Sequence, residues 1–179
     1  DPDILINNNG GPPPGNFRDW GKEEWDAGLT ANFLAPTELI RATVDGMIER
    51  GFGRIVNVTS IAVRTPFPGL AMSSASRSAL TALVASVSRE VAAHNVTINN
   101  LQPGIFETDR MLIGLKGAAK ATGRTVKDTR ASMLSNIPAG RFGDPEEFGH
   151  ACAFLCSSHS GFITGQNLLL DGGHFRGSF

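Results

Sequence analysis

A serine and an arginine stand four residues apart in a stretch of small side chains, LAMSSASRSALTAL at residues 70–83. Ser73 offers a hydroxyl, and Arg77 offers a permanent positive charge with a fork of N–H donors that can bind ligand hydroxyls. The chain contains no tyrosine, so proton transfer here has to proceed without a phenol. A structural role is also open, in which Ser73 caps N–H groups at a helix start and Arg77 forms a surface ion pair.

Polar residues and glycines also follow three short apolar runs. The runs ILI at 4–6, IVNVT at 55–59 and TINNL at 97–101 have the composition of buried strands. The segments at their carboxyl ends are residues 7–10, 59–60 and 103–108. In parallel sheets ligands bind beyond the carboxyl ends of the strands. We therefore expect these three segments to contribute to a binding site.

Helical patterns separate these strands. They cover residues 22–50, 73–94 and 144–156, with Pro36 either in a first turn or at a kink, and a last strand and turn follow at 167–173. Asp144-Pro145-Glu146-Glu147 has the composition of a capped helix start. Residues 105–143 look irregular or weakly helical. Alternating strands and helices predict an α/β fold with a parallel sheet covered on both faces.

Composition excludes several classes of protein. The net charge of −1 and the 18% of charged residues argue against a nucleic-acid binder. We see no apolar run of membrane-spanning length and no leader peptide, so we expect a cytoplasmic protein without a membrane partner. The two cysteines, Cys152 and Cys156, are expected to be small packing residues of a helix rather than a disulfide framework or a metal site.

Several segments resemble motifs of the short-chain dehydrogenase/reductase family, whose members are Rossmann-fold oxidoreductases dependent on NAD(P). The resemblance covers nearly the whole chain and is closest to 3-oxoacyl-acyl-carrier-protein reductases. The matching segments are NNNG at 7–10, TANFLAP at 30–36, IVNVTS at 55–60, NNLQPGIFETD at 99–109, GRFGDPEEF at 140–148 and ITGQNLLLDGG at 163–173. It implies a Rossmann-like, doubly wound parallel sheet in a single domain.

The resemblance also implies roles for individual residues. Ser60 stands at the place of the family's catalytic serine and Asn32 at that of its active-site asparagine. Ser73 occupies the position of the catalytic tyrosine and Arg77 that of the lysine, so neither residue is the family's usual type. Cofactor contacts are expected from Asn8, Asn9, Gly10, Arg77, Pro103, Gly104, Ile105 and Thr108. No metal is implied.

The family's first three strands have no counterpart in this chain. They normally carry the glycine-rich turn that receives the pyrophosphate. We therefore expect residues 1–179 to be the C-terminal part of one domain, with half of a cofactor site and a substrate lid at about 105–143. The 4–6 strand is then an exposed apolar edge, and we expect a longer natural protein whose isolated part is poorly soluble.

The resemblance predicts an oxidoreductase that uses NAD or NADP on a small carbonyl or acyl-thioester substrate, with the proton supplied by water or by the substrate. A homodimer or homotetramer is expected through the small residues of the 73–94 helix. Between residues 106 and 135 the lid contains six basic and three acidic residues. This excess of positive charge could receive an acidic carrier or phosphopantetheine, or the residues could form a solvated helical face.

Two alternatives stay open. The missing tyrosine favours a catalytically silent family member that serves as an oligomer partner or a binding module. Halohydrin dehalogenases, relatives that use serine, tyrosine and arginine, agree with Arg77 but not with the absence of tyrosine.

Overall fold

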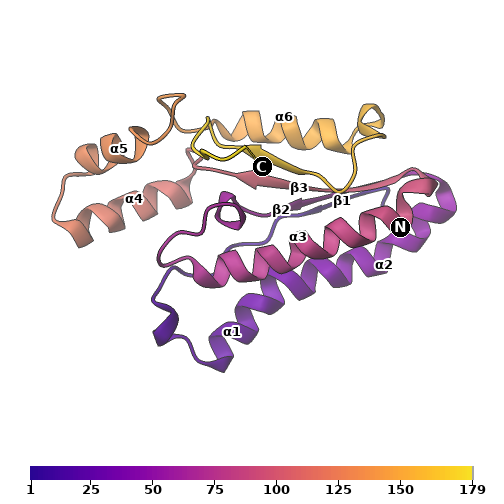
Figure 1. Ribbon diagram of the computed structural model, residues 1–179, viewed down its shortest axis with the longest axis horizontal. Coiled ribbons are helices and arrows are strands. Elements are labelled where there is room, and N and C mark those ends of the chain that lie inside the picture. Colours follow the sequence, from indigo (N-terminus) through magenta and orange to yellow (C-terminus); the bar gives the residue numbers. More distant parts are fainter. Residues whose placement is uncertain (179) are drawn as a thin grey trace.

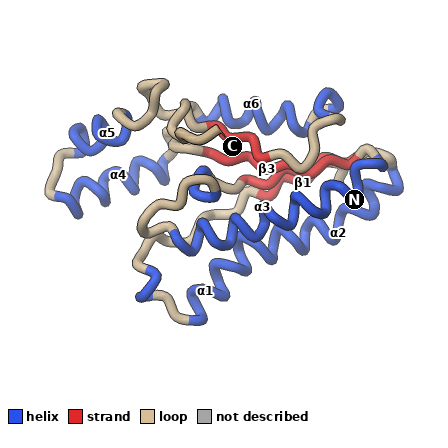
Figure 2. Tube along the Cα trace, in the orientation of Figure 1, coloured by secondary structure: helices blue, strands red, loops and turns tan. Residues whose placement is uncertain are grey.

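Four parallel strands form one sheet in the order β1-β2-β3-β4 in the computed structural model, which describes residues 1–178. They are β1 (Ile4–Asn7), β2 (Gly53–Val58), β3 (Val96–Pro103) and β4 (Asn167–Leu170). The central strands β2 and β3 are almost wholly buried. Their β-branched residues suit a sheet that is covered on both faces. The predicted parallel α/β arrangement is therefore confirmed (Figure 2).

Helices pack on the two faces of this sheet (Figure 1). α2 (Ala35–Arg50) and α3 (Ala71–Val91) cover one face, and α6 (Pro145–Cys156) covers the other. Successive strand residues point to opposite faces, so the buried neighbours Ile55 and Val56 belong to different apolar clusters. The first cluster is Ile40, Met47, Ile55, Leu80, Val84, Val91, Val96 and Ile98. The second is Val56, Leu101 and Leu155.

The helical region predicted at 22–50 consists of three joined pieces. α1 (Lys22–Leu29) runs into a π-helical turn, η2 (Thr30–Leu34), and then into α2. Pro36 lies in the first turn of α2, where a missing N–H costs little. A π-helical turn inserts an extra residue into the helix and reorients the side chains around it. Asn32 is buried within this turn.

The helix start at Asp144 is confirmed. The Asp144 side chain accepts a hydrogen bond from the Glu146 N–H, and the Glu147 carboxylate accepts one from the Asp144 N–H at 2.9 Å. Cys152 and Cys156 lie further along α6 and are half-buried, packing beside the second apolar cluster. Burial raises the pKa of the Cys156 thiol to about 11, which keeps it protonated at neutral pH.

The prediction that residues 105–143 are irregular or weakly helical was wrong in part, because most of this segment, for which we keep the name lid, is helical. It contains α4 (Asp109–Thr122) and α5 (Val126–Leu134), which contact each other and project as a pair from one end of the sheet (Figure 1). Thr108 and Thr125 cap them by accepting hydrogen bonds from Met111 and Asp128 N–H groups. These threonine caps are local signals that the sequence contained.

β1 pairs only with β2 among the described residues and forms an edge of the sheet. Its Ile4 and Ile6 side chains are 46% and 49% exposed, which confirms the predicted apolar edge. No helix in the part of the chain that the structure describes is both long enough and apolar enough to span a bilayer.

Candidate functional site

A cavity of about 580 Å³ lies where the carboxyl ends of the strands, the start of α3 and the lid meet. The three segments that follow the strands all line it, as do Ser73 and Arg77. Of the residues predicted for the site, the cavity brings together Asn8, Asn9, Gly10, Ser60, Ser73, Arg77, Pro103, Gly104, Ile105 and Thr108. These residues therefore share one cavity at this edge of the sheet.

Ser60 follows β2 and begins a short 3₁₀ turn. Its Oγ accepts a hydrogen bond of 3.1 Å from the Ala62 N–H. A hydroxyl that accepts one hydrogen bond can still donate its own proton. Ser60 is half-buried at the cavity wall, so its hydroxyl is held in place by the turn and remains able to donate to a ligand oxygen.

Ser73 lies in the first turn of α3 and is half-buried. The residue that precedes the helix is Leu70, and no side chain within residues 1–178 caps this helix start. The expected capping role of Ser73 is therefore not seen. Ser73 lines the cavity, and its hydroxyl does not cap the helix end.

Arg77 is buried, with a residue exposure of 7%. Its Nη1 donates to the carbonyl oxygen of Val58 at 2.5 Å, and its Nη2 donates to that of Asn9 at 3.3 Å. No carboxylate forms an ion pair with it among the described residues, so the surface ion pair considered for Arg77 is wrong. Burial, and then the positive charge of Arg110, lower the pKa of Arg77 to about 10.

The loop at residues 7–11 forms one wall of the cavity. The Asn9 side chain donates to the Ala31 carbonyl, and the Asn9 carbonyl accepts from Arg77. These bonds fix the loop between η2 and α3. Gly10 and Gly11 follow, and their missing side chains leave room for arginine groups.

The Pro103–Gly104 segment forms the opposite wall. The Gly104 N–H donates to the Leu170 carbonyl at 2.8 Å. A Cβ on Gly104 would lie 2.8 Å from the Asp171 Cβ and 2.9 Å from its Cα. The close approach of two backbones therefore requires glycine at this position.

Asn32 lies outside this cavity. It lines a separate cavity of about 280 Å³ together with Trp20, Gly28 and Met72. Its Nδ2 donates to the Gly28 carbonyl at 3.3 Å, while its buried Oδ1 has no hydrogen-bond partner within the described chain. Gly10, Gly11 and Pro12 line both cavities, so the loop at 7–11 separates Asn32 from Ser60.

The lid contributes residues that the sequence patterns did not assign to the site. In the sequence, Arg110 is one of several basic residues of the lid. In the structure it lines the cavity, and its Nη2 donates to the Gly11 carbonyl at 3.1 Å. No local pattern distinguishes it from the other lid cations. Apolar lid side chains complete the wall: Phe106, Met111, Leu115, Ala118 and Met133.

Comparison with known proteins assigns this chain to a family. The family model described as enoyl-(acyl carrier protein) reductase matches residues 1–174. The 3-oxoacyl-[acyl-carrier-protein] reductase FabG of Vibrio harveyi is 34% identical over 173 residues, covering 97% of this chain and 66% of that protein. The acetoacetyl-CoA reductase of Cupriavidus necator is 34% identical over 175 residues, covering 98% and 67%.

Solved structures agree with this result. YwfH, an NADPH-dependent reductase involved in bacilysin biosynthesis, superposes with a TM-score of 0.92 at 31% identity, covering 98% of this chain and 67% of that one. This chain thus spans about two thirds of the length of the proteins it matches. With its Rossmann-like α/β fold and these matching relatives, the chain belongs to the short-chain dehydrogenase/reductase family.

Proposed function

We propose that the protein is an NAD(P)-dependent oxidoreductase that acts on a carbonyl or hydroxyl group of a small substrate, as 3-oxoacyl-carrier-protein reductases do. One observation carries the proposal: Ser60, Arg77, the loop at 7–10 and the segment at 103–108 line a single cavity. Each of them occupies the place of a family motif. The names of the relatives, FabG, acetoacetyl-CoA reductase and an NADPH-dependent reductase, support this class of reaction.

The residues that line the cavity would contact such a cofactor. Asn8, Asn9, Gly10 and Arg77 all line the cavity, and Arg77 is buried. Asn8, Asn9 and Gly10 would line the adenosine side and Arg77 would bind ribose hydroxyls, while Pro103, Gly104, Ile105 and Thr108 would contact the nicotinamide side. The cofactor would supply or accept the hydride.

Ser60 would orient the substrate oxygen, because its hydroxyl can donate a hydrogen bond while the Ala62 N–H fixes its position. Reduction of a carbonyl also requires a proton on that oxygen. Ser73 carries an aliphatic hydroxyl, a much weaker acid than a phenol. Water in the open cavity would therefore deliver the proton, and turnover would be slower than with a tyrosine.

A second function is favoured by specific observations. The tyrosine position holds Ser73, and Asn32 lies in a different cavity from Ser60. A protein that binds the same ligands without turnover, or that serves as an oligomer partner, needs neither residue at the reacting atoms. The exposed small side chains Ala75, Ser78 and Ala82 on α3 would suit close packing against a second copy in a homodimer or homotetramer.

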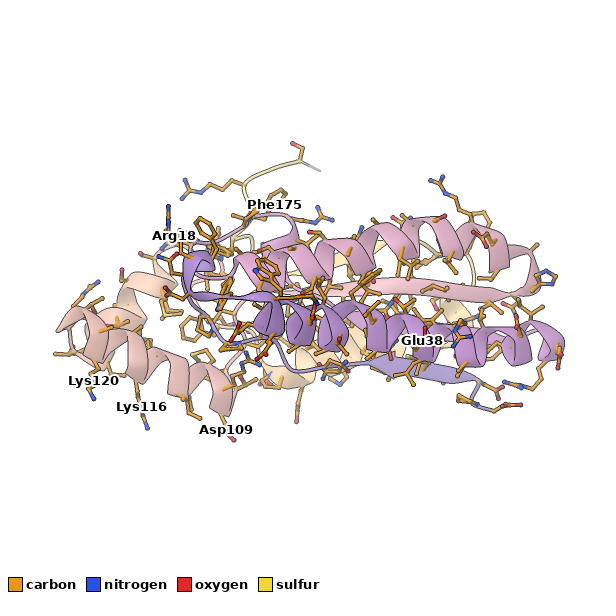
Figure 3. The ribbon with its side chains drawn as sticks, turned by 90° about the horizontal axis from the view of Figure 1, so that it is seen from below. Arg18, Glu38, Asp109, Lys116, Lys120 and Phe175 are labelled. Carbon is orange, nitrogen blue, oxygen red and sulfur yellow. The ribbon has the colours of Figure 1, made fainter. Side chains whose placement is uncertain are left out.

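The lid suits an anionic carrier in either case. Lys116 and Lys120 project from α4 away from the body of the protein (Figure 3), whereas Arg130 is paired with Glu107 at 2.9 Å. An acyl-carrier protein or a phosphopantetheine group would find these lysines accessible. Reversing both charges would raise the KM for a carrier-bound thioester and leave that for a simple ketone unchanged.

The test is oxidation of NADH and NADPH by the purified protein with 3-oxoacyl thioesters and simple ketones. Ser60→Ala should lower turnover by about a hundredfold, the range found for lost hydrogen-bond donors in active sites. Ser60→Thr should recover part of it, and Ser86→Ala on the exposed face of α3 is the matched control. Absence of turnover at high protein concentration, with cofactor still bound, would favour the silent protein.

A further inference from the structure

Two arginines reach the same point in the large cavity. A Cβ built on Gly11 would lie 3.3 Å from the Arg110 Nη2 and 3.6 Å from the Arg77 Nη2. One arginine comes from α3 and the other from the lid helix α4. Both guanidinium groups donate to carbonyls of the loop between them, Arg77 to Asn9 and Arg110 to Gly11.

This pair has no negative counterpart in the described part of the chain. The cavity lining contains both arginines and no aspartate or glutamate, and neither arginine forms an ion pair among residues 1–178. Like charges this close repel each other, and burial adds a desolvation cost for Arg77. The repulsion also contributes to the lowered pKa of Arg77. An anion between the two groups would offset the repulsion and give the buried guanidinium of Arg77 a charged hydrogen-bond partner.

The remaining N–H donors define which anion fits. Each guanidinium carries five N–H groups in a planar fork; one at Arg110 and two at Arg77 bond backbone carbonyls in this region. The others are available to a planar carboxylate or to phosphate oxygens, the groups that arginine forks bind with two parallel hydrogen bonds. Next to them lie the apolar side chains of Met111 and Leu115.

We propose that Arg77 and Arg110 together bind one anionic group, a carboxylate or a phosphate, of a molecule held in the large cavity. The inference rests on the proposed function where it concerns turnover, but anion binding itself does not need turnover. Two sources have this chemistry: an acidic substrate with an apolar part, such as an oxo acid, or a phosphate of the cofactor.

Calorimetry with inorganic phosphate and with acetoacetate, at constant ionic strength, tests the site directly. Arg110→Gln should weaken binding of at least one of these anions about tenfold or more, as expected for a lost charge-assisted bond. Arg110→Lys should retain part of the affinity. The matched control is Arg89→Gln, which removes a charge from an exposed arginine of α3 outside the cavity. Equal anion affinities in Arg110→Gln and Arg89→Gln would overturn the proposal.

Two further measurements identify the source of the anion. If the anion belongs to the substrate, Arg110→Gln should raise the KM for acetoacetate about tenfold more than the KM for its neutral ethyl ester. If the anion is a phosphate of the cofactor, Arg110→Gln should instead raise the Kd for NADPH. The ratio of the KM values for the two substrates should then stay unchanged. If no compound is turned over, the proposed function fails, while the calorimetry still decides whether the two arginines form an anion site.

Discussion

The Asn7 side chain donates a hydrogen bond of 2.8 Å from its Nδ2 to the Oδ1 of Asn57, across the neighbouring strands β1 and β2. The row continues through the sheet. Asn57 donates to Asn100 at 3.3 Å, and Asn100 donates to Asn167 at 2.8 Å. All four asparagines stand in register on adjacent strands. A side-chain amide both donates and accepts, so identical amides can form a chain across parallel strands.

Asn57→Leu should destabilise the protein by about 2 to 4 kcal/mol, because it leaves the buried Asn7 donor and the Asn100 acceptor without partners. Urea denaturation measures this difference in the free energy of unfolding. Asn136→Ala, at an exposed asparagine of the lid, is the control and should change it by less than about 0.5 kcal/mol. Similar effects of both substitutions would show that the row of amides does not stabilise the sheet.

Gly104→Ala should destabilise the protein by about 1 to 3 kcal/mol, since the added methyl group would overlap the Asp171 backbone. The same substitution at Gly117, on the open side of α4, meets nothing within 4 Å. Gly117→Ala should therefore be neutral or stabilising by up to about 1 kcal/mol. Thermal and urea unfolding of the two variants check the contrast. A neutral Gly104→Ala would mean that the two backbones can separate.

Ser73→Tyr should raise the reduction of simple ketones at neutral pH by at least about tenfold. It places a phenol one helical turn before the buried Arg77, in a cavity of about 580 Å³ with room for the ring. A nearby cation lowers the pKa of a phenol and favours proton transfer. NADPH oxidation is the measurement, and Ser132→Tyr on the exposed face of α5 is the control. A folded Ser73→Tyr protein with unchanged turnover would argue against an active site at this position.

The Arg141–Glu147 pair should make stability depend on pH. The Arg141 Nη1 and Nη2 donate to the Glu147 Oε2 and Oε1 at 2.7 and 2.6 Å. These bonds, with that from the Asp144 N–H, lower the pKa of Glu147 to about 2. A carboxyl with a lowered pKa in the folded state stabilises it above its unfolded pKa, near 4.5. This contribution is lost as the pH falls through about 2.

Glu147→Gln should therefore lower the urea midpoint at neutral pH, and its difference from the unchanged protein should shrink between about pH 4.5 and pH 2. Glu146→Gln, at the neighbouring exposed carboxylate, is the matched control. A difference that stays constant over this range would exclude the ion pair as its cause.

Local patterns in the sequence predicted much of this fold. Runs of apolar, β-branched residues determined the strands, and the Asp144 cap determined the start of α6, because such signals act between residues close in the chain. The sequence also pointed to the segments that follow the strands as the place of a site, since parallel strands present their carboxyl ends at one edge. The lid was expected to be irregular or only weakly helical, although the capping threonines Thr108 and Thr125 were available as a signal for its two helices.

Other features were decided only by tertiary packing. The burial of Arg77, the separation of Asn32 from Ser60 and the reach of Arg110 to Gly11 all join segments far apart in the chain. The distances in space between these residues cannot be predicted from their spacing along the sequence. They follow from the π-helical turn, the path of the loop at 7–11 and the position of α4. The sequence determined which side chains are available for chemistry, and packing decided which of them share a cavity and which charges lack a partner.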